Sequence, residues 1–195
     1  MPIVSRSTAL VIGLALTGCA GGAYRPVSDV PVKLGAPYRV RGTTYVPAVD
    51  LRYDVLGYAS WYGSESGNRT ANGERFRADW VTGAHTTLPL PTYVEVTALD
   101  TGRRIVVRIN DRGPFAGGSA RIIDLSRGAA EQLGIRATGP AAVRVRRIEP
   151  STEDRARLRK GKPARALPPI SERERINLRG QLANDRYASV SNSLR

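Results

Sequence analysis

The sequence predicts a mainly β fold, a barrel of roughly six short strands with one or two short helices. Residues 93–99, 104–110 and 142–148 alternate apolar with polar side chains, which is the period of half-buried strands. Residues 100–102 (Asp-Thr-Gly) separate the first two of these strands, and they predict a hairpin turn. Several short strands with turns between them favour a closed barrel, because closure leaves no sheet edge exposed.

The elements that follow the hairpin are a strand and a helix. Residues 121–125 (RIIDL) form a short apolar run typical of a buried strand. Ser126 is a good N-cap residue, and Gly134 suits the position just after a helix C-terminus. Between them, Ala129, Ala130 and Leu133 fall on one helix face. The chain then returns to the barrel through its last strand, residues 142–148.

The N-terminus resembles the export signal of a bacterial lipoprotein. A short head with Arg6 precedes an apolar stretch, residues 9–16, that is too short to span a membrane. The only cysteine of the chain, Cys19, follows in the segment Leu-Thr-Gly-Cys, which resembles a lipobox. This resemblance implies a signal peptide at residues 1–18 and a diacylglycerol on Cys19; the alternative is a general secretory signal with a chance cysteine. Ala20, where an Asp would favour inner-membrane retention, points to the outer membrane, facing the periplasm.

Three further segments complete the predicted organisation. Residues 19–56 are rich in Gly and Pro and predict a tether, part of which (residues 38–47) packs on the barrel as an edge strand. Residues 57–149 hold the strand patterns and predict the folded barrel. Residues 150–195 are Arg-rich and poor in bulky apolar residues, so we expect a mostly disordered tail, with a short helix around residues 172–182 as the alternative.

Composition limits the classes of partner and site. The net charge of +13 favours a polyanionic partner, but export argues against nucleic acid, and much of the charge lies outside the barrel. One cysteine excludes an internal disulfide and a multi-cysteine zinc site, and the one histidine has no H-x-x-H partner. We therefore expect no metal, no cofactor and no nucleic acid, and a monomer.

Three polar residues are candidates for chemistry. Glu74, His85 and Asp111 each lie beside turn residues at the end of an apolar segment, where rigid folds usually present functional groups. Each also has a structural interpretation: a solvated turn residue, a hydrogen-bonded structural histidine and an Asx turn, respectively. The chain lacks the G-x-S-x-G motif that a serine hydrolase would need. The residues alone leave these alternatives open.

Several motifs around these residues resemble the RlpA (rare lipoprotein A) family. The resemblance runs from residue 57 to residue 149 and rests on GYASWYG, RTANGERF, AHTTLPLPTYVEVTALDTGRRIVVRINDRGPF and RIIDLSRGAAEQLG, in that order. It implies a double-psi β-barrel that acts as an endolytic lytic transglycosylase on peptide-poor glycan strands of peptidoglycan. The chain departs from the family at Arg77, where Asp or Asn is usual, and it shows no C-terminal SPOR domain.

The resemblance also assigns roles to residues. The acidic residue of the family's N-G-E motif falls on Glu74, its histidine on His85, and the aspartate of its N-D-R-G-P-F motif on Asp111. We expect Asp111 to act as acid and base, with Glu74 and His85 orienting the site. The remaining residues expected to bind substrate are Trp61, Tyr62, Thr70, Asn72 and Arg112. A non-catalytic, expansin-like peptidoglycan-binding or structural lipoprotein is the alternative.

Overall fold

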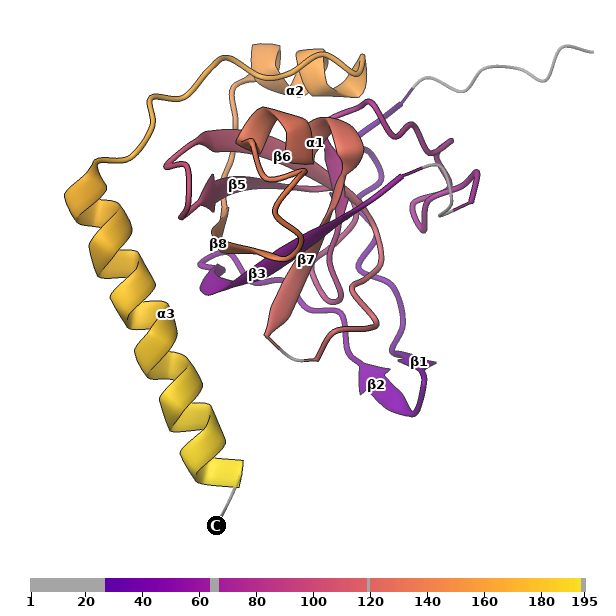
Figure 1. Ribbon diagram of the computed structural model, residues 1–195. Helices are drawn as coiled ribbons and strands as arrows, with labels where there is room; N and C mark the ends of the chain where they lie inside the picture. Colours follow the sequence, from indigo (N-terminus) through magenta and orange to yellow (C-terminus); the bar gives the residue numbers. More distant parts are fainter. Residues whose placement is uncertain (1–26, 64–66, 119, 194–195) are drawn as a thin grey trace, which may run out of the picture.

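The predicted barrel is confirmed, and it is closed. A computed structural model describes residues 27–63, 67–118 and 120–193. Six strands form the barrel in the order β3-β7-β4-β6-β5-β8, with the short helix α1 beside it (Figure 1). The strands are β3 (Asp54–Tyr62), β4 (Thr82–Ala84), β5 (Thr92–Ala98), β6 (Arg104–Asp111), β7 (Arg121–Ser126) and β8 (Ala141–Arg147). The pairs β3–β7 and β4–β6 are parallel and the other four antiparallel, and the fold is a double-psi β-barrel.

The core is built from the inward residues of these strands. Val96, Val107 and Ile109, for example, are fully buried, and each such side chain contributes about 1.5–3 kcal/mol. The alternating pattern predicts half-buried strands, but every residue of β5 is buried. The reasons are long-range: Arg155, from the C-terminal region, lies over the ring of Tyr93, 5.3 Å from its centroid, and Glu95 forms ion pairs with arginines of both neighbouring strands. The outward face of β5 is thus covered by chain that the local pattern cannot reveal.

Helix α1 (Arg127–Leu133) has the caps that the sequence predicts. The Ser126 hydroxyl accepts the N–H of Ala129, and Gly134 is left-handed, with φ of 73°. The helix packs closely because of Gly128, where a Cβ atom would lie 2.2 Å from the carbonyl oxygen of Asp79. Helix α1 therefore anchors the end of β7 against the core.

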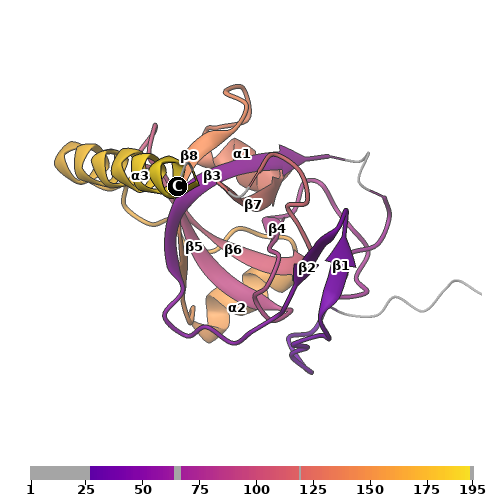
Figure 2. The same ribbon diagram turned by 90° about the horizontal axis from the view of Figure 1, so that it is seen from below.

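The N-terminal segment contains a hairpin rather than one edge strand. Strands β1 (Tyr38–Val40) and β2 (Thr43–Tyr45) pair only with each other, and Figure 2 shows them beside the barrel. The Tyr38 hydroxyl donates to the carbonyl oxygen of Thr86 at 2.7 Å. The rings of Tyr38 and Tyr45 stack, with centroids 5.3 Å apart, and both contact Phe115 edge-on. These contacts attach the hairpin to two barrel loops.

The C-terminal region differs from the disordered tail that composition predicts. It contains α2 (Thr152–Arg159) and the long helix α3 (Glu172–Ser193). Leu158 of α2 is buried in the barrel core cluster. Leu178 and Leu182 of α3, one helical turn apart, pack against Leu99 in a second cluster. Few apolar residues are present, but these three leucines all face the barrel, which an average over composition does not show.

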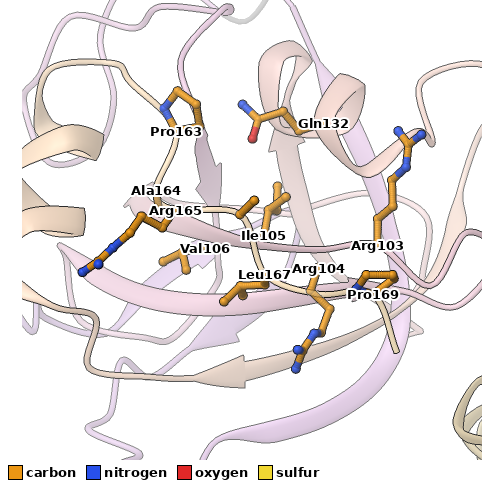
Figure 3. Close-up of a pocket in the computed structure, with 11 residues that line it drawn as sticks. Arg103, Arg104, Ile105, Val106, Gln132, Pro163, Ala164, Arg165, Leu167 and Pro169 are labelled. Atoms are coloured by element: carbon orange, nitrogen blue, oxygen red, sulfur yellow. The ribbon is translucent and has the colours of Figure 1, made fainter. Parts of the chain in front are cut away.

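Between the two helices, residues 160–171 form a connecting segment, the strap, that runs across β6. A pocket of about 440 Å³ separates strap and strand and has Ile105, Val106 and Leu167 among its lining residues. Figure 3 shows the guanidinium groups of Arg103, Arg104 and Arg165 pointing away from one another, so this pocket offers no convergent anion site. Within the residues that the structure describes, no helix has both the length and the hydropathy to cross a membrane.

Candidate functional site

Four residues form a row across four neighbouring strands. Strand register pairs Ser60 of β3 with Asp124 of β7, Asp124 with Ala84 of β4, and Ala84 with Asp111 of β6. Directly paired residues point to the same side of a sheet, and two strand spacings place the Asp111 and Asp124 Cα atoms roughly 10 Å apart. Gly113 packs over Ala84, since a Cβ atom on Gly113 would lie 3.5 Å from the Ala84 Cβ and 3.6 Å from Asp124 Oδ2. We call Ser60, Asp124, Ala84 and Asp111 the carboxylate row.

Asp111 lies at one end of the carboxylate row and forms no ion pair with any of the described residues. Its Oδ1 atom accepts the backbone N–H groups of Ala71 and Arg112, both at 2.8 Å. Its Oδ2 atom has no hydrogen-bond partner among the described residues. Burial raises the pKa of the carboxyl above its usual value, although the two amide hydrogen bonds oppose the rise. A carboxyl held in this way has one oxygen fixed and the other available to exchange a proton.

The loop of residues 67–76 holds the first of those amides in place. Thr70 closes the turn, because its N–H donates to the carbonyl oxygen of Glu74 and its hydroxyl accepts the N–H of Glu74. Asn72 donates its N–H to the carbonyl oxygen of Asn110, at the end of β6. Ala71 lies between Thr70 and Asn72, and these bonds therefore aim its N–H at Asp111. Thr70 and Asn72 act here on the loop backbone.

Glu74 is neutralised by a buried arginine. Arg108, with 1% of its surface exposed, donates to Glu74 Oε2 at 2.7 Å and to Asp29 Oδ1 at 3.0 Å. The side chains of Asn110 and Asn72 donate one further hydrogen bond each to the Glu74 carboxylate, both at 2.8 Å. We call Asp29, Glu74 and Arg108 the buried ion network. It pairs the charge of Glu74, so burial rather than Glu74 accounts for the raised pKa of Asp111.

His85 is buried and neutral, and the structure identifies its tautomer. Its Nδ1 atom accepts the N–H groups of Thr87, at 3.2 Å, and Leu88, at 3.1 Å. The ring proton is therefore on Nε2, which donates to the Tyr53 hydroxyl at 2.9 Å. Burial, reinforced by the charge of Arg112, lowers the pKa of His85 to about 4. No carboxylate among the described residues bonds the imidazole; its hydrogen bonds stabilise the 85–88 turn.

The aromatic residues expected to bind substrate have partners within the protein. The Trp61 ring nitrogen donates to the carbonyl oxygen of Arg136 at 3.1 Å. The Tyr62 ring stacks on Phe76, with centroids 5.0 Å apart. The buried Tyr62 hydroxyl has no partner among the described residues, and its pKa is raised first by burial and then by the charges of Asp111 and Asp124. Tyr62 therefore places a protonated hydroxyl near both carboxylates.

The two arginines singled out in the sequence make different contacts. The Arg112 guanidinium donates to the carbonyl oxygens of His85, Leu88 and Leu34, so it ties two loops together; it makes no ion pair with Asp111, although its charge opposes the rise of the Asp111 pKa. Arg77 lies over the Trp80 ring, 5.2 Å from its centroid. The substitution at position 77 thus has a local packing role.

Sequence reasoning missed Asp124. Its Oδ1 accepts the Ser60 hydroxyl at 2.5 Å, and its Oδ2 accepts Arg121 at 2.9 Å. The available signal was a carboxylate inside the apolar run RIIDL, but only the strand order shows that it lies across Ala84 from Asp111. The site therefore contains a second carboxylate, balanced by a cation.

The sequence of the barrel matches a known family. Residues 54–145 match the family model described as lytic transglycolase. The chain is 53% identical over 116 residues to the endolytic peptidoglycan transglycosylase RlpA of Pseudomonas aeruginosa, a match that covers 58% of this chain and 33% of that protein. It is 41% identical over 125 residues to the protein of the same name from Rickettsia bellii, covering 62% and 54%, respectively. The chain thus spans about a third to a half of these relatives.

Solved structures of similar shape are more distant in sequence. The Streptomyces papain inhibitor aligns with a TM-score of 0.41 and 22% identity, over 50% of this chain and 96% of the inhibitor. An expansin from Clavibacter michiganensis aligns with a TM-score of 0.40 and 18% identity, over 51% and 52% of the two chains.

Proposed function

The barrel of this chain belongs to the RlpA family, and from that premise we propose that the protein is an endolytic lytic transglycosylase. Its substrate would be the glycan strand of peptidoglycan, cut at the β-1,4 bond between N-acetylmuramic acid and N-acetylglucosamine. The curated relatives carry that activity in their names. The observation that carries the proposal for this chain is Asp111: a carboxyl with a raised pKa, one oxygen held by two amides, and no cation upon it.

The chemistry requires one group that gives and then takes a proton. Protonated Asp111 donates to the glycosidic oxygen as the bond from that oxygen to the muramic C1 atom breaks. The muramic 6-hydroxyl then forms a bond to C1 and loses its proton to the Asp111 carboxylate, which restores the acid. The product ends in a 1,6-anhydro ring, and no water enters. A raised pKa suits the first step, because the proton is still present nearer to neutral pH.

The other residues of the site support this proton transfer. The 67–76 loop fixes Oδ1 of Asp111 through the Ala71 amide, which leaves Oδ2 for the substrate. Asp124, held by Ser60 and Arg121, supplies a second carboxylate on the row, with its Cα atom roughly 10 Å from that of Asp111. We assign it the stabilisation of positive charge that develops on the sugar ring during cleavage. Glu74 and His85 are positioning residues in this scheme.

Product analysis tests the proposal against the non-catalytic alternative. The full chain would be incubated with purified sacculi, both peptide-bearing and amidase-stripped, and the released material analysed by mass spectrometry. Fragments with anhydro ends are expected, in larger amounts from stripped strands. An expansin-like binder would release none, and their absence from both preparations would contradict the transglycosylase.

We propose further that the protein is an envelope lipoprotein, anchored in the outer membrane through Cys19. Cys19 lies outside the residues that the structure describes, so the proposal rests on the lipobox-like segment and on a substrate located in the periplasm. Cys19→Ala should move the protein from the membrane fraction into the soluble periplasmic fraction, because a lipid-modified terminus holds a protein far more firmly than peptide contacts do. Retention of the variant in the membrane would exclude the lipid anchor.

A further inference from the structure

A second pocket lies next to the carboxylate row, between the β1–β2 hairpin and the barrel. Its volume is about 490 Å³, within the range of about 300–1,000 Å³ typical of small-molecule sites. Its walls come from four places in the chain: the hairpin, Tyr53 just before β3, His85 and the turn after it, and residues between Pro114 and the start of β7. We call it the hairpin pocket. The hairpin, residues 38–45, lies outside the residues that match the family model.

The lining of the hairpin pocket is aromatic and hydroxylic, with little charge. Tyr45 and Phe115 contribute half-buried rings, and Thr43, Thr86 and Thr87 contribute hydroxyl-bearing side chains. Among the described residues, the lining contains no carboxylate, and the one cation that it contains, Arg121, is already paired with Asp124. A pyranose ring has an apolar C–H face and a rim of hydroxyl and amide groups. Aromatic rings and hydroxyls together suit such a neutral sugar better than an ion or a lipid tail.

Tyr53 adds a directed hydrogen-bond donor. Its hydroxyl oxygen accepts the Nε2–H of His85, and so its own proton is free for another acceptor. Burial raises the pKa of Tyr53, which keeps that proton in place. Both side chains line the pocket, and the tautomer of His85 is fixed by the Thr87 and Leu88 amides. His85 thus holds Tyr53 as a donor.

The hairpin pocket is linked to the carboxylate row through one of its lining residues. Arg121 lines the pocket and bonds Asp124 of the carboxylate row. Phe115 follows Asp111 by four residues. We propose that the hairpin pocket is a saccharide subsite that binds an N-acetylated sugar of the same glycan strand, next to the bond that is cut. The Tyr45 and Phe115 rings would pack on the sugar face, and Tyr53 would donate to a sugar oxygen. This inference rests on the proposed function.

A test of the saccharide subsite must measure binding separately from turnover. In an Asp111→Asn background, which keeps the strand intact, the affinity for short and long fractions of peptide-free glycan strands would be measured by calorimetry. Tyr45→Ala should weaken binding of long strands about tenfold, as expected for the loss of one stacked ring, and leave short fractions that fill only the central site unchanged. Tyr53→Phe should give a several-fold loss with the ring contacts intact. Val46→Ala, at an exposed neighbouring position, is the matched control.

The outcomes distinguish the two proposals. If long strands bind the Tyr45→Ala and Tyr53→Phe variants as tightly as the Asp111→Asn parent, the subsite is overturned, while cleavage by the unaltered protein still upholds the proposed function. If the unaltered protein does not cleave and the parent does not bind, the proposed function fails and the subsite fails with it. Tyr45→Phe keeps the ring and should restore long-strand affinity, which separates stacking from a loss of hairpin structure.

Discussion

Asp111 and Glu74 are two carboxylates joined by one loop, and they differ in how their charge is balanced. Asp111 accepts only backbone amides, and burial raises its pKa. Glu74 accepts the guanidinium of Arg108 and the side chains of Asn72 and Asn110. Both lie at turns beside apolar strands, so turn position does not distinguish them, and the family resemblance alone favoured Asp111 as the acid and base.

The difference separates a reactive group from a structural one. Keeping Asp111 unpaired costs stability, because desolvation disfavours its charged form. Glu74 belongs to the buried ion network, in which removal of one charge leaves its partner buried and unpaired. The 67–76 loop connects the two regions: Glu74 fixes the loop to Arg108, and the loop directs the Ala71 amide at Asp111. We infer that the ion network positions the acid.

The largest expected effect is on activity, at Asp111. Asp111→Asn should reduce release of anhydro products by about 10²–10⁴-fold, the usual contribution of a positioned acid or base. Asp124→Asn, the matched change on the other side of Ala84, should cost about tenfold, because it alters charge without removing the transferred proton. Timed digests of sacculi measure both.

Asp111→Asn, which should lower activity, should leave stability unchanged or increase it. A carboxyl whose pKa is raised on folding stabilises the fold fully below its unfolded pKa, and this contribution is lost as the pH rises through the folded pKa. Near neutral pH, Asp111→Asn should therefore unfold at the same urea concentration as the unaltered protein or at a higher one. A large loss of stability would show that Asp111 is a structural turn residue.

The next effect is on stability, at Arg108. Arg108→Met removes the cation from the buried ion network and should cost about 3–5 kcal/mol of unfolding free energy, as is typical when one partner of a buried ion pair is deleted. Arg103→Met, at an exposed position near the start of the same strand, should change it by less than about 0.5 kcal/mol. Urea unfolding measures both. Equal effects of the two changes would refute the network.

Glu74→Gln sharpens the comparison further. The amide keeps an oxygen for Asn110 and Arg108 but loses the charge, so we expect a smaller loss of stability than for Arg108→Met. Activity should fall with the loop displacement rather than through loss of a proton. A variant that is as inactive as Asp111→Asn while remaining fully stable would instead place Glu74 among the catalytic groups.

The sequence predicted the parts of the fold that depend on local pattern. Alternation located β5, β6 and β8, and the caps of α1 were readable because Ser126 and Gly134 act on neighbouring backbone. Strand β4 has only three residues and was not predicted, since so short a run has no period. Helix α2 was missed, and α3 was anticipated only as a short alternative helix around residues 172–182, because their few leucines gain stability from distant partners rather than from helix pattern.

In the candidate site, too, local features were predictable from the sequence and long-range contacts were not. Turn position was enough to single out Asp111, Glu74 and His85. The pairing of Glu74 with Arg108 spans 34 residues, and the row that joins Asp111 to Asp124 depends on strand order. Neither relation leaves a signal in the local sequence, so sequence reasoning gave Glu74 an orienting role without its partner Arg108 and did not consider Asp124.

The smallest effect is a pH dependence of stability that originates at His85. Its pKa is lowered from 6.5 to about 4 in the folded protein, so the unfolded state binds the proton more readily, and stability falls as the pH falls from 6.5 towards 4. The full contribution, ~3 kcal/mol, is present above pH 6.5. In His85→Asn, the side-chain oxygen can still accept the Thr87 and Leu88 amides but does not titrate, so its urea midpoint should vary less over this range. Parallel curves for the two proteins would mean that the imidazole is solvated and free to act as an acid or base, which would return His85 to the catalytic group.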